Sequence, residues 1–144
     1  MRRRDFFLHL PVLGPGLALG VSTLALGACA GVRYVVPRTD ADRLVVGLAD
    51  LEAGGELFLQ APGMPRPVYV RRLPGGEIVA LLASCTHAGC QPEPVGDRLA
   101  CPCHGSEFSF DGLVLQGPAE RPLTRYPVSV QGEDVIVRLD GGGA

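Results

Sequence analysis

Residues 85–90 read Cys85-Thr86-His87-Ala88-Gly89-Cys90, and residues 101–106 read Cys101-Pro102-Cys103-His104-Gly105-Ser106. We call these segments box 1 and box 2. Each box carries a histidine close to a cysteine and one further cysteine, so each can supply one thiolate and one imidazole as metal ligands. Two loops of this kind predict a single site assembled from both boxes.

Several kinds of site would use these residues. Cysteine and histidine at this spacing suit a tetrahedral zinc ion. The cysteines alone would form a disulfide framework with incidental histidines, or the pattern would arise by chance. The remaining kind is a [2Fe–2S] cluster with two thiolates on one iron and two imidazoles on the other. Gly89, Pro102 and Gly105 favour the cluster, because tight loops bring backbone amides close to sulfur ligands.

Both boxes resemble those of the Rieske iron–sulfur proteins, in particular the disulfide-containing, high-potential type of cytochrome bc complexes. The resemblance implies one [2Fe–2S] cluster, with Cys85 and Cys101 on the inner iron and His87 and His104 on the outer iron. Neutral imidazoles reduce the negative charge of the site. The potential therefore rises from roughly −400 mV for all-cysteine plant-type clusters to about −150 to +300 mV.

The same resemblance gives roles to other residues near the boxes. Cys90 and Cys103 match the positions that form a disulfide between the two loops, a bond expected in an oxidising compartment. Ser106 matches a serine that donates a hydrogen bond to a bridging sulfide in high-potential members. Phe108 stands where those members often carry a tyrosine that donates to a ligand sulfur. Without that hydroxyl, we expect a potential above the ferredoxin type and below the quinol-oxidising maximum.

The resemblance also implies an architecture. A base of antiparallel sheets would carry a smaller cluster-binding part, here about residues 83–119. Gly117-Pro118 looks like the proline loop that covers the cluster from one side in this family. The histidines would face solvent at the tip.

Residues 1–28 are predicted to be a targeting segment. Arg2-Arg3-Arg4 precedes an apolar stretch from Leu8 to Ala28, which resembles a twin-arginine signal. That route fits a cluster inserted in the cytoplasm, because the protein must then cross the membrane folded. Leu26-Gly27-Ala28-Cys29 resembles a bacterial lipobox, which would make Cys29 a lipidation site. Alternatively, the apolar stretch remains as an uncleaved anchor, since 21 residues can span a bilayer. In both cases we expect a membrane-anchored domain facing the periplasm or cell exterior.

Composition indicates one small domain with many turns. The chain has 20 glycines and 13 prolines, which favour turns over helices. Its formal net charge is −2, and its 13 basic residues are all arginines that do not cluster in one stretch. This distribution indicates no nucleic-acid-binding surface.

Short β-prone runs separated by turns predict an all-β fold of stacked antiparallel sheets. Hairpins are expected across Leu73-Pro74-Gly75-Gly76 and across Gly132-Glu133. Residues 29–42 are expected to be a tether and residues 43–140 the domain, with one weak helical turn at 48–53. The expected strands are 43–48, 56–60, 68–72, 77–82, 107–110, 113–115, 128–131 and 134–139.

Three functions fit this sequence. The first is electron transfer within a quinol-oxidising cytochrome bc-type chain, from quinol and cytochrome b to a cytochrome c-type carrier. The second is the small subunit of an exported oxidoreductase such as an arsenite oxidase, favoured by the short spacer of 13 residues between His87 and Cys101. The third is a Rieske ferredoxin for an oxygenase, against which the signal and the disulfide cysteines count.

An oxygenase itself is excluded by the residues available. Its mononuclear iron needs two further histidines and a carboxylate, and the only histidine outside the boxes is His9. We therefore expect a carrier of electrons that has no substrate-activating site of its own.

Overall fold

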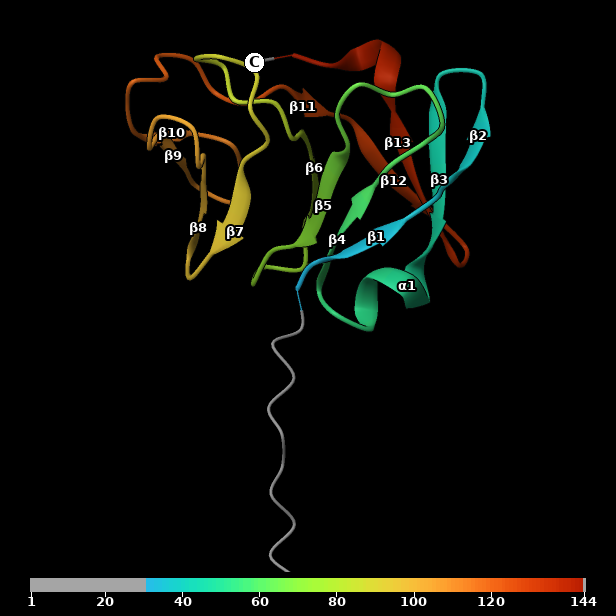
Figure 1. The fold of residues 1–144 in the computed structure, drawn as a ribbon. Coiled ribbons are helices and arrows are strands. Elements are labelled where there is room, and N and C mark those ends of the chain that lie inside the picture. The colour runs from blue at the N-terminus through green and yellow to red at the C-terminus, as the bar shows by residue number, and fades with distance from the viewer. Residues whose placement is uncertain (1–30, 144) are drawn as a thin grey trace, which may run out of the picture.

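The computed structural model describes residues 31–143, which fold into three small sheets (Figure 1). Sheet A has the strand order β1-β4-β5-β6-β11, sheet B β12-β13-β3-β2 and sheet C β10-β9-β8-β7. The elements are β1 (Arg33–Val35), β2 (Arg38–Asp40), β3 (Arg43–Gly47), α1 (Leu48–Glu52), β4 (Glu56–Leu59), β5 (Val68–Arg72), β6 (Ile78–Leu82), β7 (Glu93–Val95), β8 (Arg98–Ala100), β9 (Glu107–Phe108), β10 (Val114–Gln116), β11 (Arg125–Tyr126), β12 (Val128–Gln131), β13 (Asp134–Arg138) and a 3₁₀-helix (Leu139–Gly141). The expected all-β fold of stacked, mainly antiparallel sheets is confirmed, with β1 and β4 forming a parallel pair.

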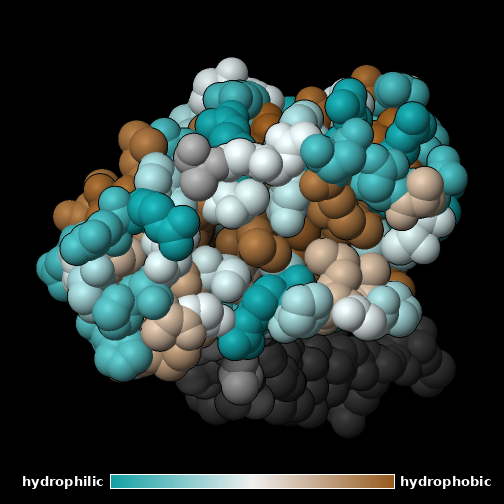
Figure 2. Space-filling model, turned by 90° about the horizontal axis from the view of Figure 1, so that it is seen from above, coloured by the Kyte–Doolittle hydropathy of each residue, from teal (hydrophilic) through white to brown (hydrophobic). Residues whose placement is uncertain are grey.

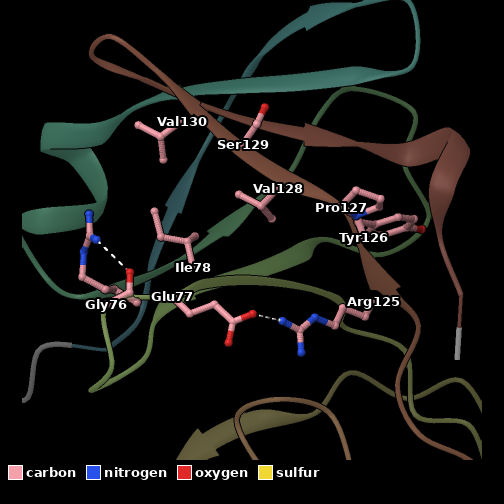
Figure 3. A pocket seen from close by; sticks show the side chains of 10 residues that line it. Gly76, Glu77, Ile78, Arg125, Tyr126, Pro127, Val128, Ser129 and Val130 are labelled. Atoms are coloured by element: carbon pink, nitrogen blue, oxygen red, sulfur yellow. Dashed lines mark hydrogen bonds and ion pairs between the residues drawn. The ribbon is translucent and has the colours of Figure 1, made fainter.

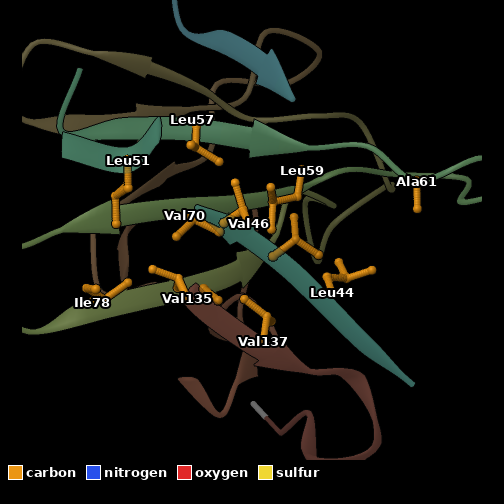
Figure 4. Close-up of a cluster of buried hydrophobic side chains, with 12 residues drawn as sticks. Leu44, Val46, Leu51, Leu57, Leu59, Ala61, Val70, Ile78, Val135 and Val137 are labelled. Atoms are coloured by element: carbon orange, nitrogen blue, oxygen red, sulfur yellow. The ribbon is translucent and has the colours of Figure 1, made fainter. Parts of the chain in front are cut away.

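Sheet A contributes to two hydrophobic cores. Because successive side chains of a strand point to opposite faces, Leu57 and Val70 enter one core while their neighbours Phe58 and Tyr69 enter the other. The first core lies between sheets A and B, where these leucine and valine side chains meet Val135 (Figure 4). The second core joins sheet A to sheet C. Burial of both faces explains why these strands have continuous hydrophobic runs instead of a polar–apolar alternation.

Both predicted hairpins are confirmed. β5 and β6 pair across the turn at residues 73–76. In this turn the Leu73 N–H donates a hydrogen bond to the Glu77 carbonyl at 2.7 Å. Gly76 has a φ of 88°, a conformation that glycine adopts without steric cost. β12 and β13 pair across the turn that contains Gly132.

The predicted tether at 29–42 needs correction. Residues Arg33–Val35 form β1 and pair with β4, and Arg38–Asp40 form β2 and pair with β3. The polar sequence of 38–42 is typical of a loop, but β2 is an edge strand whose three residues are exposed. Edge strands tolerate such polar residues, and charge on an edge opposes unwanted pairing. Residues 29 and 30 lie outside the described part.

Sheet C contains a hairpin that the sequence did not predict, β7–β8. Pro94 lies in the middle of β7 and suggests a break, yet β7 is the edge strand of its sheet, where a missing N–H is tolerated. Box 1 connects β6 to β7 and box 2 connects β8 to β9, so both boxes lie at the upper end of the molecule in Figure 1. Within residues 31–143, no helix has the length and apolar character needed to cross a membrane.

Candidate metal centre

The two boxes adopt the same backbone turn. In box 1, the Gly89 N–H donates to the Cys85 carbonyl at 2.7 Å, and the Cys85 N–H donates to the Cys90 carbonyl at 2.7 Å. In box 2, the Gly105 N–H donates to the Cys101 carbonyl at 3.1 Å, and the Cys101 N–H donates to the Ser106 carbonyl at 2.8 Å. Both glycines have positive φ values, 74° and 76°, which explains why this position is glycine in each box.

Each turn directs backbone amides at a buried sulfur. Burial alone would raise the pKa of the Cys85 thiol, but hydrogen bonds from the His87 and Ala88 amides lower it below the ordinary value. Cys101 receives the corresponding amides of its own box, while burial and the neighbouring Cys85 sulfur raise the pKa of its thiol. The two thiols lie together, 3% and 2% exposed, and amide donors of this kind stabilise thiolate ligands.

The two histidines form the exposed side of the site. Both are solvent-exposed, and their rings lie edge to face with centroids 5.0 Å apart. Within residues 31–143, no three Cys, His, Asp or Glu side chains surround a point that one metal ion would occupy. The donors of His87, His104 and the two thiols instead form one buried pair and one exposed pair.

Ser106 links box 2 to the proline loop and to a thiol of box 1. Its side chain is fully buried, and its oxygen accepts the Ala119 N–H at 2.9 Å. Its hydroxyl also donates to the Cys85 sulfur and favours the thiolate. Gly117 and Pro118 precede Ala119 and are joined by a cis peptide bond. Ala119 lies in the same buried cluster as Cys85 and Cys101.

The Cys90–Cys103 disulfide joins the two boxes directly, and its Cα atoms are 6.4 Å apart. The predicted pairing is confirmed. Cys85 and Cys101 are the free cysteines of the described part of the chain. The disulfide fixes the distance between the turn of box 1 and the turn of box 2.

The family model for the Rieske [2Fe–2S] domain matches residues 42–127. The chain belongs to the Rieske [2Fe–2S] family. The cofactor of this family is one [2Fe–2S] cluster, and the separation of thiols from imidazoles fits it. Four donors converging on one zinc ion would have a different arrangement.

The Rieske chain is similar to several known Rieske proteins. It is 32% identical over 142 residues to the cytochrome b6-f complex iron–sulfur subunit of Chlorobaculum tepidum, covering 94% of this chain and 75% of that one. A crystal structure of a cyanobacterial plasma membrane Rieske protein from Synechocystis PCC 6803 is 41% identical, with a TM-score of 0.59 over 66% of this chain and 98% of that one. The ferredoxin in a carbazole 1,9a-dioxygenase complex is 27% identical, with a TM-score of 0.55 over 69% and 94%. The Rieske chain is thus an electron-transfer protein related to the Rieske subunits of cytochrome b6-f and bc complexes.

The structure brings together the box residues and Ser106 that the sequence selected, and it places Phe108 in the same buried cluster as the two free cysteines. Cys29 lies outside the described residues. Sequence reasoning missed two polar contacts that support the Rieske boxes. The Thr86 hydroxyl donates to the Arg121 carbonyl at 2.6 Å, and the Gln116 amide donates to the Gly105 carbonyl at 3.1 Å. For the Thr86 contact, the only sequence signal is the position of Thr86 beside His87 in box 1.

Replacing Ser106 by alanine should destabilise the Rieske domain by about 1–3 kcal/mol, because the buried Ala119 N–H loses its acceptor. The free energy of unfolding in urea is the measurement. Ser129→Ala is the matched control, since Ser129 is exposed on β12. Equal effects of the two substitutions would contradict the role given to the Ser106 hydroxyl.

Proposed function

We propose that this chain is the iron–sulfur subunit of a quinol-oxidising cytochrome bc-type chain, on the outer face of a bacterial membrane. One observation carries the proposal: two buried thiols and two exposed imidazoles are held by the same pair of turns. The Chlorobaculum relatives are named as subunits of cytochrome b6-f complexes, which supports cytochromes as partners here.

The proposed ligand roles follow from the buried and the exposed side of the site. Cys85 and Cys101 would hold the inner iron of the cluster, and His87 and His104 would hold the outer iron. When bound, the cluster accepts and releases one electron. The buried thiols keep water away from the inner side, while the imidazoles provide the side that a partner can touch.

The exposed imidazoles combine electron transfer with proton transfer. An exposed ring nitrogen of His87 or His104 accepts a hydrogen bond from a quinol hydroxyl and takes its proton as the quinol loses an electron. An open pocket of about 480 Å³ beside His87 leaves room for this approach; it is lined by Thr86, His87, Pro118, Glu120 and Arg121. The electron then passes to a cytochrome c-type carrier.

A second candidate is the small Rieske subunit of an exported, arsenite-oxidase-like enzyme. The short 13-residue spacer between His87 and Cys101 favours it. A gene for cytochrome b beside this one would support the first function, and a gene for a molybdenum enzyme would support the second. A ferredoxin role is disfavoured by the Cys90–Cys103 disulfide, because such bonds are rare in a reducing cytosol.

We further propose that lipid on Cys29 anchors the domain after removal of residues 1–28, all of which lie outside the described residues. Support comes from the sequence Leu26-Gly27-Ala28-Cys29 and from the description of one similar protein as a plasma membrane protein. Cys29→Ser should then move the protein from the membrane fraction to the soluble fraction. Retention in the membrane with an intact residue 1–28 segment would instead identify an uncleaved anchor.

The midpoint potential of the full chain should be positive and should fall as the pH rises past neutrality. An added electron makes the surroundings of His87 and His104 more negative, and negative charge favours the protonated imidazole. Reduction therefore takes up a proton, which becomes less favourable at high pH. An EPR-monitored redox titration at several pH values measures this dependence. A low midpoint that does not vary near neutral pH would contradict quinol oxidation.

Phe108→Tyr should raise the midpoint potential. Phe108 is fully buried in the same cluster as Cys85 and Cys101, and a hydroxyl there would donate to a ligand sulfur. One added hydrogen bond of about 0.5–1.5 kcal/mol corresponds to a rise of roughly 20–60 mV. The same redox titration measures it, and an unchanged midpoint would show that Phe108 only fills space.

A further inference from the structure

Aromatic side chains form a row across the face of sheet A that meets the cluster-binding sheet C. Tyr34 on β1 is the register partner of Phe58 on β4, and Phe58 is the register partner of Tyr69 on β5. The ring centroids are 4.9 Å apart for Tyr34 and Phe58, 5.4 Å for Phe58 and Tyr69, and 6.3 Å for Tyr69 and Phe110. These separations are those of favourable aromatic pairs. We call Tyr34, Phe58, Tyr69 and Phe110 the aromatic row.

Each end of the aromatic row contacts a segment that leaves one of the boxes. At one end, the Gln91 side-chain amide donates to the Tyr34 hydroxyl, and Gln91 directly follows Cys90. At the other end, Phe110 lies in the segment that follows box 2 and Phe108. The aromatic row therefore links the segment that follows box 1 to the segment that follows box 2 along sheet A.

Arg71 fixes the Phe110 end. Its guanidinium carbon lies 3.7 Å from the centroid of the Phe110 ring, and a cation in this position is attracted by the ring face. Glu56 accepts hydrogen bonds from Arg71 and from the Tyr69 hydroxyl, so the cation is neutralised in place. The Arg71 Nε atom is buried and makes no hydrogen bond within residues 31–143. The Arg71 guanidinium thus contacts the Phe110 ring and pairs with Glu56, while its Nε–H donates no hydrogen bond within residues 31–143.

We propose that the aromatic row, with Arg71, is a second brace on the two boxes, which holds them in register independently of the Cys90–Cys103 disulfide. Its use rests on the proposed function at the outer face of the membrane, together with the twin-arginine export expected from the sequence, in which the cluster is inserted in the cytoplasm before export. Thiols stay reduced in that compartment, so the disulfide is absent when the boxes first bind iron. The brace keeps the two turns together at that stage.

A double-mutant comparison on the full-length holoprotein tests the brace. Tyr34→Phe with Arg71→Met removes the contacts at both ends of the row without emptying the core. Cys90→Ser with Cys103→Ser removes the disulfide. Tyr126→Phe with Arg125→Met is the matched control, because it changes the same residue types on β11 of sheet A, where Arg125 pairs with Glu77 away from the boxes (Figure 3).

The first readout is the rate at which the visible absorbance of the cluster is lost in the presence of a chelator. We expect the brace and cysteine substitutions together to speed this loss at least tenfold beyond the product of their separate effects, as coupled sites do. The control pair should combine with the cysteine substitutions multiplicatively. Multiplicative behaviour of the brace pair as well would overturn the proposal.

The second readout is hydrogen exchange of residues 85–91 and 107–112. In the brace variant it should increase in these segments and not in β3 or β13. An even increase across the domain, as general destabilisation would give, would also overturn the proposal. If Arg71→Met prevents folding, Tyr34→Phe alone, combined with Cys90→Ser and Cys103→Ser, provides the same comparison. Neither readout depends on a membrane, a quinol or a cytochrome, so failure of the brace is distinguishable from failure of the proposed function.

Discussion

The hydrogen bonds from backbone amides to the buried sulfurs of Cys85 and Cys101 are the interaction on which the site depends. Two thiolates can lie close together in a protein interior only if their negative charge is stabilised, and each box supplies two amides of its own turn for this purpose. The turn needs a glycine at its fifth residue, so Gly89 and Gly105 are structural requirements of the ligand chemistry. The amides of each turn point at the buried thiols, and the histidine side chains of the same turns lie on the solvent-exposed side of the site.

Sheet A connects this site to the rest of the molecule. One of its faces packs against sheet B in an aliphatic core (Figure 4). The other face presents aromatic residues to the cluster-binding sheet. The boxes are consequently held by two separate sets of contacts, the Cys90–Cys103 disulfide and the proposed aromatic brace. Seen from above, hydrophilic residues cover much of the surface, and hydrophobic residues gather near its centre and at its left edge (Figure 2). Two exposed hydrophobic residues lie at the cluster-binding sheet: Leu115 in β10, 58% exposed, and Leu113 directly before β10, 55% exposed.

The parts of this structure that could be predicted from sequence are those determined by neighbouring residues. The boxes and the glycine turn at residues 73–76 are local patterns, and both were predicted correctly. Strand β1 could not be predicted, because its pairing with β4 depends on contacts more than twenty residues away. The same limit applies to the contact between Tyr34 and Gln91, which lie 57 residues apart in the sequence. Such contacts follow from the packing of the sheets and leave no local signal.

The proposed ligand set places two histidines and two cysteines on one [2Fe–2S] cluster. Pulsed EPR of the reduced full chain, labelled with ¹⁵N only in histidine, tests this most directly. The chain contains three histidines, and our account predicts strong couplings to nitrogens of two of them, His87 and His104. Loss of one coupling in His87→Gln or in His104→Gln would support the assignment of each ligand. A reduced iron–sulfur signal without histidine nitrogen coupling would contradict it.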